Sequence, residues 1–386
     1  MSFIGQNTTR AKQFNRSLVF QTLIRLQSTT RQEIASNTKL TPATITNIVN
    51  EFMSEGIVSE AGSRRSESQK AGRKTMMLDL NERARLVAGI HIRSDRVELG
   101  IVTLKGNVIA EQQFWLPDGC DQHDFLRLLK DELTVFLRAH EDLTVAAIGI
   151  GSVGLVDFER GVLLEAKHLG WNEVALVNEL QAEYAVPVYL DHNVRGMALG
   201  EKLFGSCKTE TDFLSVYMGQ GIGAGMYVND QIYRSDVTGA GELGHATYQP
   251  EGEPCWCGNH GCLERYASEE AILSEWGIGS VDELLKAYAD GDAQADRALR
   301  QAGKQIGIVL TSFVNMFHVN RIIIGGRLAQ ENTPLLAEVD HHVNTRSFLA
   351  RKRDVIVSRT SLGEQLGVTG AASVALLYGV ISLEIN

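Results

Sequence analysis

Apolar residues recur at helical spacing near the start of the chain. One stripe carries three of them, Val19, Leu23 and Leu26. This spacing predicts a first helix beginning near Asn15. Thr30 and Glu33 then have the spacing of a capping box, in which each side chain satisfies the other's backbone N–H, so a second, short helix should end near Thr38.

A third helix should begin at Thr41-Pro42, because threonine is a good N-cap and proline suits the first helical position. Gly56 is placed to end it. Its apolar positions are Ile45, Ile48, Val49 and Phe52, which form one buried face. The opposite face carries small or amide side chains, namely Ala43, Thr44, Thr46, Asn47 and Asn50. Such a face is suited to reading base edges in a DNA major groove.

A hairpin should follow the third helix. Ile57–Glu60 and Thr75–Leu80 are typical of two strands, separated by a basic tip around Arg64 and Arg65. Three helices and a hairpin predict a winged helix-turn-helix, in which the hairpin with its basic tip is the wing. Its DNA contacts would come from Thr41, from the polar face of the third helix and from the wing. Gly72, Arg73 and Lys74 could lie in a minor groove. The alternatives are a three-helix packing module with a solvated basic loop and, for residues 70–74, a solvated loop.

The rest of the chain alternates between strand-like and helical patterns. Predicted strands are Leu86–Ile92, Val97–Thr103, Val108–Gln113, Val145–Ile150, Val186–Leu190, Phe213–Met218 and 321–324; predicted helices are Phe125–His140, Arg195–Phe204 and Ala293–Val319. Several strands run into glycine-rich turns, for example residues 151–154 and 219–225. Strand, glycine turn and helix in repetition indicate an α/β fold. A glycine turn alone does not establish a ligand loop.

Length and charge separate a head from a body. A chain of 386 residues suggests more than one domain. Residues 1–80 carry 11 Lys and Arg against 6 Asp and Glu, a net +5, whereas the whole chain is −10. A basic head on an acidic body suits a DNA-binding module attached to a larger domain. We therefore expect domains at residues 1–80 and 81–386. Without a signal peptide or a long unbroken apolar run, we expect a cytoplasmic protein with no membrane span.

Three of the five cysteines crowd into one short segment. His245, Cys255, Cys257 and Cys262 offer one imidazole and three thiolates, a complete tetrahedral set for zinc. No ligand position remains open, so the sequence predicts one structural zinc per chain. Gly258 and Gly261 would let the backbone bend so that the sulfurs converge. Unliganded buried thiols are the alternative.

The segments GELGH (241–245) and CWCGNHGCLE (255–264) resemble the signature of the ROK family, whose name stands for repressors, open reading frames and kinases. The resemblance continues through 149–157, 187–193, 198–205, 219–225 and 321–329 and covers essentially all of 84–386. It implies an actin-like, two-lobed, sugar-kinase-like domain. Lobe one would be about 84–190 plus a C-terminal helix within about 362–386, and lobe two about 191–361. The head matches the family's repressor branch.

The resemblance also implies that the kinase chemistry is lost. Kinases of the family carry Asp-x-Gly-Gly-Thr on the first hairpin, where this chain has Arg93 in place of a glycine. Asn193 stands at the position of the catalytic aspartate and lacks the carboxylate needed to accept a hydroxyl proton. Gln220 replaces the threonine of the second phosphate loop. We therefore expect no enzyme activity.

By the same resemblance, the sugar-binding residues are Gly154, Asn193, Glu242, His245 and Glu264. Carboxylates suit sugar recognition because each accepts hydroxyl hydrogen bonds. His192 stands where the family usually has asparagine, and Glu242 and Glu264 could instead be solvated surface carboxylates. His245 has two candidate roles, of which zinc ligation is the firmer.

We expect a repressor of carbohydrate-utilisation genes that binds a palindromic operator as a homodimer or higher homo-oligomer. A monosaccharide would change its DNA affinity by closing the cleft between the lobes. Xylose is the first candidate, because residues 198–205 look closest to the family's xylose-responsive branch; glucose and N-acetylglucosamine follow. Two alternatives remain: a sugar kinase with a DNA-binding head, and a repressor switched by a partner protein.

Overall fold

The computed structural model describes residues 8–64, 75–234 and 241–381. The chain divides into two compact units, Met1–Asn193 with Val368–Asn386, and Val194–Gly367. Each unit contains a five-stranded sheet, and the two sheets have the same topology: a three-stranded antiparallel meander followed by two parallel strands. Mixed α/β architecture is the fold class that the sequence predicts.

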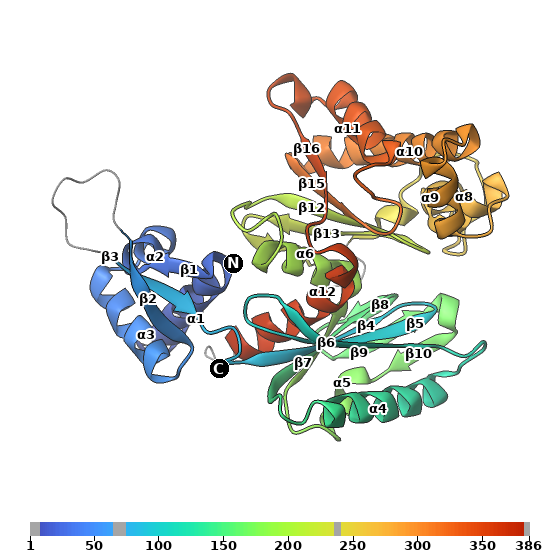
Figure 1. Ribbon diagram of the computed structural model, residues 1–386. Coiled ribbons are helices and arrows are strands. Elements are labelled where there is room, and N and C mark those ends of the chain that lie inside the picture. The colour runs from blue at the N-terminus through green and yellow to red at the C-terminus, as the bar shows by residue number, and fades with distance from the viewer. Residues whose placement is uncertain (1–7, 65–74, 235–240, 382–386) are drawn as a thin grey trace. The chain divides into compact units, whose positions relative to one another are not determined.

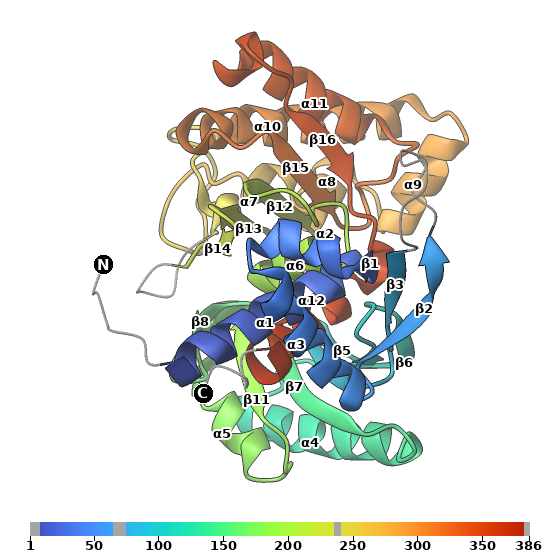
Figure 2. The same ribbon diagram turned by 90° about the vertical axis from the view of Figure 1, so that its left-hand side faces the viewer.

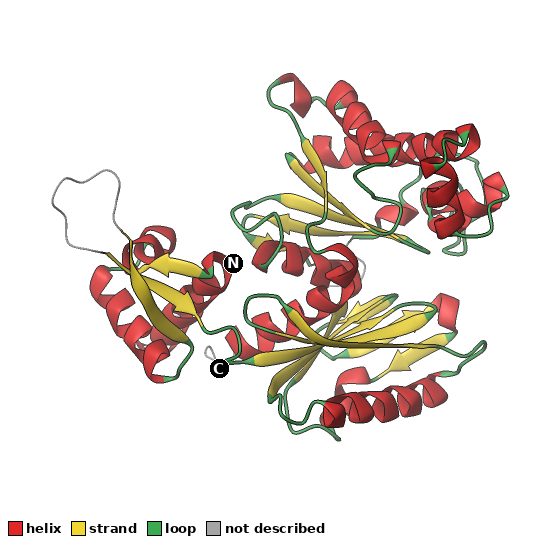
Figure 3. Cartoon of the chain, in the orientation of Figure 1, coloured by secondary structure: helices red, strands yellow, loops and turns green. Residues whose placement is uncertain are grey.

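The head of the first unit contains the three predicted helices and the predicted hairpin (Figure 3). Its helices are α1 (Thr8–Leu26), α2 (Arg31–Thr38) and α3 (Pro42–Ser54), and its hairpin strands are β2 (Val58–Arg64) and β3 (Thr75–Leu80). The capping box is confirmed, because Thr30 Oγ1 accepts the Glu33 N–H at 3.1 Å and Glu33 Oε2 accepts the Thr30 N–H at 2.9 Å. Thr41 caps α3 by accepting the Thr44 N–H at 3.2 Å.

The head differs from the prediction in two places. α1 begins at Thr8 rather than near Asn15. The prediction placed the start too late because the first turns of α1 are polar and show no apolar stripe. A short strand, β1 (Ser28–Thr30), pairs with β3, so the sheet order is β1-β3-β2. The four predicted core residues of α3 are buried, with Phe52 tilted against Phe20 at a centroid distance of 5.2 Å.

Hydrogen bonds between described residues join this head to the rest of the same unit. The Ser17 hydroxyl donates to the Ile381 carbonyl at 2.7 Å, and the Gln27 amide donates to the Lys105 carbonyl at 3.1 Å. Lys105 Nζ also donates to Asp79 Oδ1 at 3.1 Å. The head is therefore anchored through α1, through the chain that follows it and through β3.

The large sheet of the first unit has the order β11-β7-β4-β5-β6; β4, β5, β6 and β7 are labelled in Figure 1. Its strands are β4 (Leu86–Ile92), β5 (Arg96–Val102), β6 (Val108–Trp115), β7 (Val145–Ser152) and β11 (Val188–His192). A small sheet contains β8 (Leu155–Asp157), β9 (Val162–Ala166) and β10 (Trp171–Val174), with η1 (Lys167–Leu169) between the last two. β4 has the predicted bounds, whereas the small sheet was not predicted.

Helices cover both faces of this large sheet. α4 (Gln122–Ala139) and α5 (Leu176–Gln181) pack on the apolar face through residues such as Phe125 and Leu176. α12 (Leu366–Ala375), continued by the π-helix η5 (Leu376–Ile381), lies on the other face. There a Cβ on Gly149 would stand 2.0 Å from the Ala371 carbonyl oxygen. Glycine is needed at this position because the helix backbone lies directly on the strand.

The second unit has the sheet order β14-β13-β12-β15-β16. The strands are β12 (Phe213–Met218), β13 (Ile222–Val228), β14 (Gln231–Ile232), β15 (Arg321–Gly325) and β16 (Ile356–Arg359). Its helices are α6 (Asn193–Leu203, whose first residue belongs to the first unit), α7 (Glu264–Ala267), α8 (Glu269–Trp276), α9 (Val281–Ala289), α10 (Ala293–Phe317) and α11 (Pro334–Arg346), with short turns η2 (Leu243–His245), η3 (Leu349–Arg351) and η4 (Gly363–Gln365). Figure 2 shows α10 and α11 side by side beyond β15 and β16.

The glycine run at 219–225 is only partly a loop. Ile222–Gly225 belongs to β13, and a Cβ on Gly225 would stand 2.2 Å from the Val194 carbonyl oxygen of α6. These glycines therefore allow a helix to pack closely on a strand. The sequence alone does not distinguish this use of glycine from a ligand loop.

One described segment, Gly363–Ile381, is long and apolar enough to cross a membrane by length and composition alone. However, 78% of its most apolar window is buried inside the protein. Core helices of soluble proteins pass the same test, so this segment is weak evidence for a membrane span.

Candidate functional site

The second unit brings together the four residues that the sequence predicts as metal ligands. The ligand atoms of His245, Cys255, Cys257 and Cys262 all lie within 4.8 Å of one another. Cys257 Sγ and Cys262 Sγ are 3.6 Å apart, and Cys255 Sγ is 3.7 Å from His245 Nδ1. Zinc–sulfur bonds of about 2.3 Å at tetrahedral angles place two sulfurs roughly 3.8 Å apart. The spacing of the donors therefore fits a small tetrahedral cation.

The loop backbone accounts for this convergence. Gly258 and Gly261 have φ values of +94° and +72°, in the left-handed region that glycine adopts at little cost. A Cβ on Gly261 would stand 1.7 Å from the Gln249 carbonyl oxygen. Burial, aided by hydrogen bonds that the Cys262 thiol makes with Cys257 and Cys255, raises the pKa of Cys262 to about 12. A bound metal ion would therefore have to displace a proton from this sulfur.

The same loop holds Glu264, the first residue of α7. Its Oε2 accepts the Ile222 N–H at 3.1 Å, and its Oε1 accepts the Trp256 Nε1–H at 2.9 Å. Gly221 and Gly244 leave space for the carboxylate, because an added Cβ would stand 2.8 Å and 3.2 Å from Oε2. Both oxygens of Glu264 are thus oriented by protein donors.

Glu242 and His245 flank the short turn η2. Burial raises the pKa of Glu242; the charge of Arg195 opposes this, and Glu264 adds to it. The three predicted sugar-binding residues of the second unit, Glu242, His245 and Glu264, therefore belong to one polar region beside the candidate metal centre. Arg195, a buried residue of α6, was not predicted as a member of this region.

The two predicted sugar-binding residues of the first unit lie on separate elements. Gly154 has φ +90°, and a Cβ there would stand 2.3 Å from the Glu165 carbonyl oxygen. This glycine is therefore required by the small sheet, whatever else it contacts. Asn193 is buried at the start of α6.

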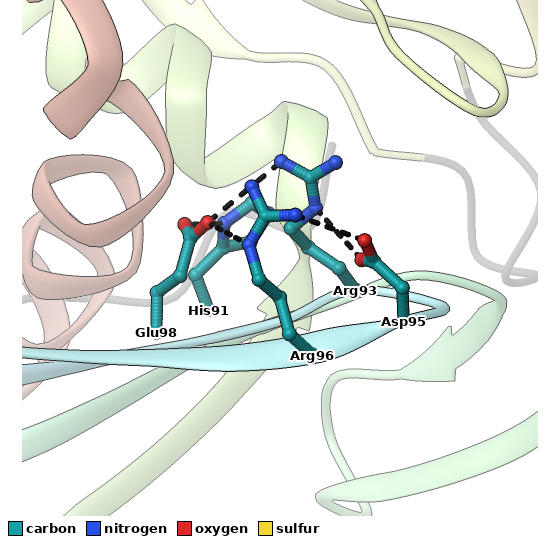
Figure 4. Close-up of polar contacts among 5 residues, drawn as sticks. All are labelled: His91, Arg93, Asp95, Arg96 and Glu98. Carbon is teal, nitrogen blue, oxygen red and sulfur yellow. Dashed lines mark hydrogen bonds and ion pairs between the residues drawn. The ribbon is translucent and has the colours of Figure 1, made fainter. Parts of the chain in front are cut away.

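The first hairpin carries a compact set of charges at the position where the sequence resemblance implied a lost phosphate loop (Figure 4). Arg96 Nε donates to Glu98 Oε1 at 3.0 Å and Arg96 Nη1 to Asp95 Oδ2 at 2.9 Å. Arg93 pairs with the same two carboxylates at 3.3 Å and 3.7 Å. We call Arg93, Asp95, Arg96 and Glu98 the hairpin quartet.

His91 completes this arrangement from β4. Its Nδ1 lies 2.9 Å from Glu98 Oε2, and its ring is almost fully buried. Burial works to raise the pKa of Glu98, but the hydrogen bond from His91 and the charges of His91, Arg93 and Arg96 lower it to about 2. Glu98 is therefore ionised near neutral pH, and it pairs with both arginines of the quartet. The sequence pointed to Arg93 alone.

The predicted DNA-binding residues of α3 lie on its accessible side. Thr41, Ala43, Thr46, Asn47 and Asn50 are exposed and Thr44 is partly exposed. Thr46 donates to the Pro42 carbonyl at 2.8 Å, and Asn50 Oδ1 accepts from Arg31 at 3.5 Å. Arg65, Gly72, Arg73 and Lys74 lie outside the described residues, and of Arg64 only the backbone, at the end of β2, is described.

The fold and the His/Cys loop define a class: two-unit α/β proteins of the sugar-kinase type, here with a helical head. Residues 87–377 match the ROK family, and the chain belongs to that family.

Relatives and solved structures agree with this class. The chain is 30% identical to the "Xylose repressor" of Caldicellulosiruptor bescii over 390 residues, covering 96% of this chain and 97% of the relative. A crystal structure described as a ROK family transcriptional regulator, homolog of E. coli MLC protein, superposes with a TM-score of 0.81 at 26% identity, covering 97% of this chain and 99% of that one. A Streptomyces griseus ROK glucokinase in complex with glucose and AMPPNP gives 0.66 at 25% identity, covering 74% and 98%.

Proposed function

We propose that this protein is a sugar-responsive transcriptional repressor that binds its effector without phosphorylating it. The observation that carries the proposal is the contrast between Glu264, whose carboxylate is oriented by two neutral donors, and the hairpin quartet, whose charges are paired internally. The two repressor-related matches extend over the head, whereas the glucokinase match covers 74% of this chain. Their coverage supports a repressor that shares its body with sugar kinases.

Residues 1–80 would be the DNA-binding domain. α3 offers a face of small and amide side chains, and among the described residues the exposed Asn47 side chain makes no hydrogen bond. An uncommitted amide can read an adenine edge in the major groove. Arg64, Arg65 and the segment from Gly72 to Lys74 would add phosphate and minor-groove contacts. Two heads of a symmetric dimer would read the halves of a palindromic operator.

Residues 81–386 would be the effector domain. Glu242, His245 and Glu264, with Gly154 and Asn193, would bind a monosaccharide, and carboxylates would select for its hydroxyl groups. Xylose is the first candidate, because the Caldicellulosiruptor bescii relative is named a xylose repressor. Sugar binding would alter operator affinity only as far as the sugar prefers one conformation of the protein.

Zinc is the metal we assign to the loop. His245, Cys255, Cys257 and Cys262 would hold it, because one imidazole and three thiolates at tetrahedral spacing are a typical structural zinc set. The ion would hold the segment between His245 and Glu264 in one conformation. The protein's own donors then orient Glu264.

The hairpin argues against kinase activity. A phosphate loop needs backbone N–H groups open to a nucleotide, whereas Arg93 and Arg96 are engaged by Asp95 and Glu98 above the turn (Figure 4). Asn193 has no carboxylate to accept a proton from a sugar hydroxyl.

The test combines three assays on the purified chain. An operator is first selected from a random DNA pool; its binding is then titrated with xylose, glucose and N-acetylglucosamine, and ADP release is followed with each sugar. We expect a cytoplasmic repressor whose operator affinity changes with one monosaccharide. Sugar-dependent ADP release at ordinary kinase rates of about 1–100 s⁻¹ would refute the non-enzyme part. If operator affinity is unchanged by every sugar but changes when a protein from the cell is added, the alternative of a repressor switched by a partner protein is favoured.

A further inference from the structure

Trp256 lies between two of the candidate zinc ligands but is not itself a ligand. Its side chain is 39% exposed. Its Nε1–H donates to Glu264 Oε1 at 2.9 Å. The indole thus connects the metal loop with a carboxylate that we assign to sugar binding.

The second contact of Trp256 is with His245. The two rings meet edge to face, with centroids 4.7 Å apart and an interplanar angle of 83°. Such T-shaped aromatic pairs are favourable beyond the area that they bury. One side chain therefore contacts two residues of the polar region, through a hydrogen bond to Glu264 and through its ring to His245.

The position of the indole depends on the loop on both sides. Cys255 and Cys257 are its chain neighbours, and both belong to the four-residue donor cluster. Cys255 N–H also donates to the Asn259 carbonyl at 2.8 Å, and Gly258 N–H to the Cys255 carbonyl at 3.0 Å. A loop held at residues 255 and 257 leaves the backbone of Trp256 little freedom.

The hydrogen bond from Trp256 restricts the rotation of the Glu264 carboxylate. Oε2 is already held by the Ile222 N–H, so a second donor on Oε1 determines the plane of the group. A carboxylate held in one plane presents its remaining lone pairs in defined directions. A hydroxyl of the wrong configuration cannot then be accepted by rotation of the acceptor.

We propose that Trp256 is a positioning residue for effector binding, which orients the Glu264 carboxylate toward a sugar hydroxyl. The inference rests on the proposed function, because it assumes that Glu264 binds a sugar. It gives the exposed indole a role in specificity as well as affinity.

Trp256→Phe tests this with little change of shape, since phenylalanine keeps an aromatic ring and loses the Nε1–H donor. We expect the affinity for the effector sugar to fall roughly ten- to a hundredfold, the range for a hydrogen bond to a charged group. The ratio of affinities between the effector and its epimers should also fall. Zinc per chain should stay as in the wild type. Trp115→Phe, which removes an exposed indole from the first unit, is the matched control and should bind sugar normally.

A double-mutant cycle with Glu264→Asp separates positioning from general damage. If Trp256 acts through the Glu264 carboxylate, Trp256→Phe should lower sugar affinity much less in the Glu264→Asp background. The shorter side chain of aspartate no longer reaches the indole N–H, so the hydrogen bond is already lost. Calorimetric titration of the four proteins with xylose, glucose and N-acetylglucosamine measures this coupling.

The possible failures are distinguishable. A wild-type protein that binds no monosaccharide overturns the proposed function, and this inference with it. A wild-type protein that binds sugar while Trp256→Phe binds it equally well overturns the inference alone. Loss of zinc in Trp256→Phe, or additive effects in the cycle, would also overturn it by showing a merely structural indole.

Discussion

The first hairpin and the metal loop use carboxylates in opposite ways. On the hairpin, Glu98 and Asp95 face two guanidinium groups and an imidazole, so neighbouring side chains offset their negative charges (Figure 4). On the loop, both oxygens of Glu264 accept from neutral donors, a backbone N–H and an indole. These neutral donors orient the carboxylate without neutralising it. The carboxylates of the hairpin are therefore paired with cationic side chains. The carboxylate of Glu264 has neutral donors instead and can still accept hydrogen bonds from hydroxyl groups.

The pKa values express the same difference. Despite burial, His91 and the arginines lower the pKa of Glu98 to about 2, while burial raises the pKa of Glu242. Glu98 is stabilised as an ion by its neighbours. Burial disfavours the charged form of Glu242, and the charge of Arg195 offsets only part of this effect.

Among the variants considered, one that removes the metal from the loop should have the largest effect on sugar response. In Cys257→Ser, we expect loss of zinc and of sugar response together, because a structural zinc contributes on the order of 10 kcal/mol to ordering its ligands. The head should keep non-specific DNA affinity. Zinc is measured by elemental analysis and sugar binding by titration, with Cys120→Ser as the control, since Cys120 lies outside the cluster. A metal-free Cys257→Ser protein with full sugar response would contradict the assigned role of zinc.

Disrupting the hairpin should cost stability in a pH-dependent way. The pKa of Glu98 is about 2 in the folded protein against an ordinary 4.5, so its ionised form stabilises the fold above pH 4.5. This stabilisation, up to about 3 kcal/mol, is lost as the pH falls from 4.5 toward 2. Glu98→Gln should unfold at lower temperature than the wild type at pH 7, and the gap should narrow by pH 3.

The matched control for this experiment is Glu159→Gln, which removes an exposed carboxylate from the same unit. Its unfolding temperature should follow the wild type at every pH. A gap between Glu98→Gln and the wild type that stayed constant from pH 7 to pH 3 would show that the charge of Glu98 is not what stabilises the hairpin.

Neutralising the loop carboxylates should leave the fold intact and remove the sugar response. Glu264→Gln and Glu242→Gln should each weaken sugar binding by about 2 kcal/mol, the scale of a hydrogen bond to a charged group. Operator affinity without sugar should stay near the wild-type value. Glu270→Gln, at an exposed position on α8, is the control. Unchanged sugar affinity in both variants would remove these carboxylates from the proposed site.

Local signals in the sequence predicted much of this molecule. The capping box at Thr30 and Glu33, the start of α3 and the spacing of the cysteines are short-range patterns, and the structure confirms each. A β-strand such as β4 is also visible as a mostly apolar run, interrupted only by His91. The mixed α/β fold class followed from the alternation of such segments.

Long-range pairing was not predictable in the same way. Gly225 was read as part of a loop, although it belongs to β13 and packs under Val194. The sequence shows Arg93 in place of a glycine, but its pairing with Asp95 and Glu98 depends on the turn geometry of the hairpin. The role of Trp256 could not be predicted, because nothing in the sequence indicates that its Nε1 reaches Glu264.

The smallest expected effects concern the head, and they test whether DNA recognition is separate from both regions compared above. Asn47→Ala should relax sequence preference at one base pair, at a cost of about 1–3 kcal/mol against the selected operator. Arg64→Ala should weaken binding to all sequences and reduce the salt slope by about one. Both variants should bind zinc and sugar as the wild type does, because neither residue belongs to the body. Binding to the selected operator and to a scrambled duplex, measured across a salt series, separates the two effects. If Asn47→Ala lowers affinity equally for both duplexes, or if Arg64→Ala leaves the salt slope unchanged, α3 and the wing do not contact DNA as proposed.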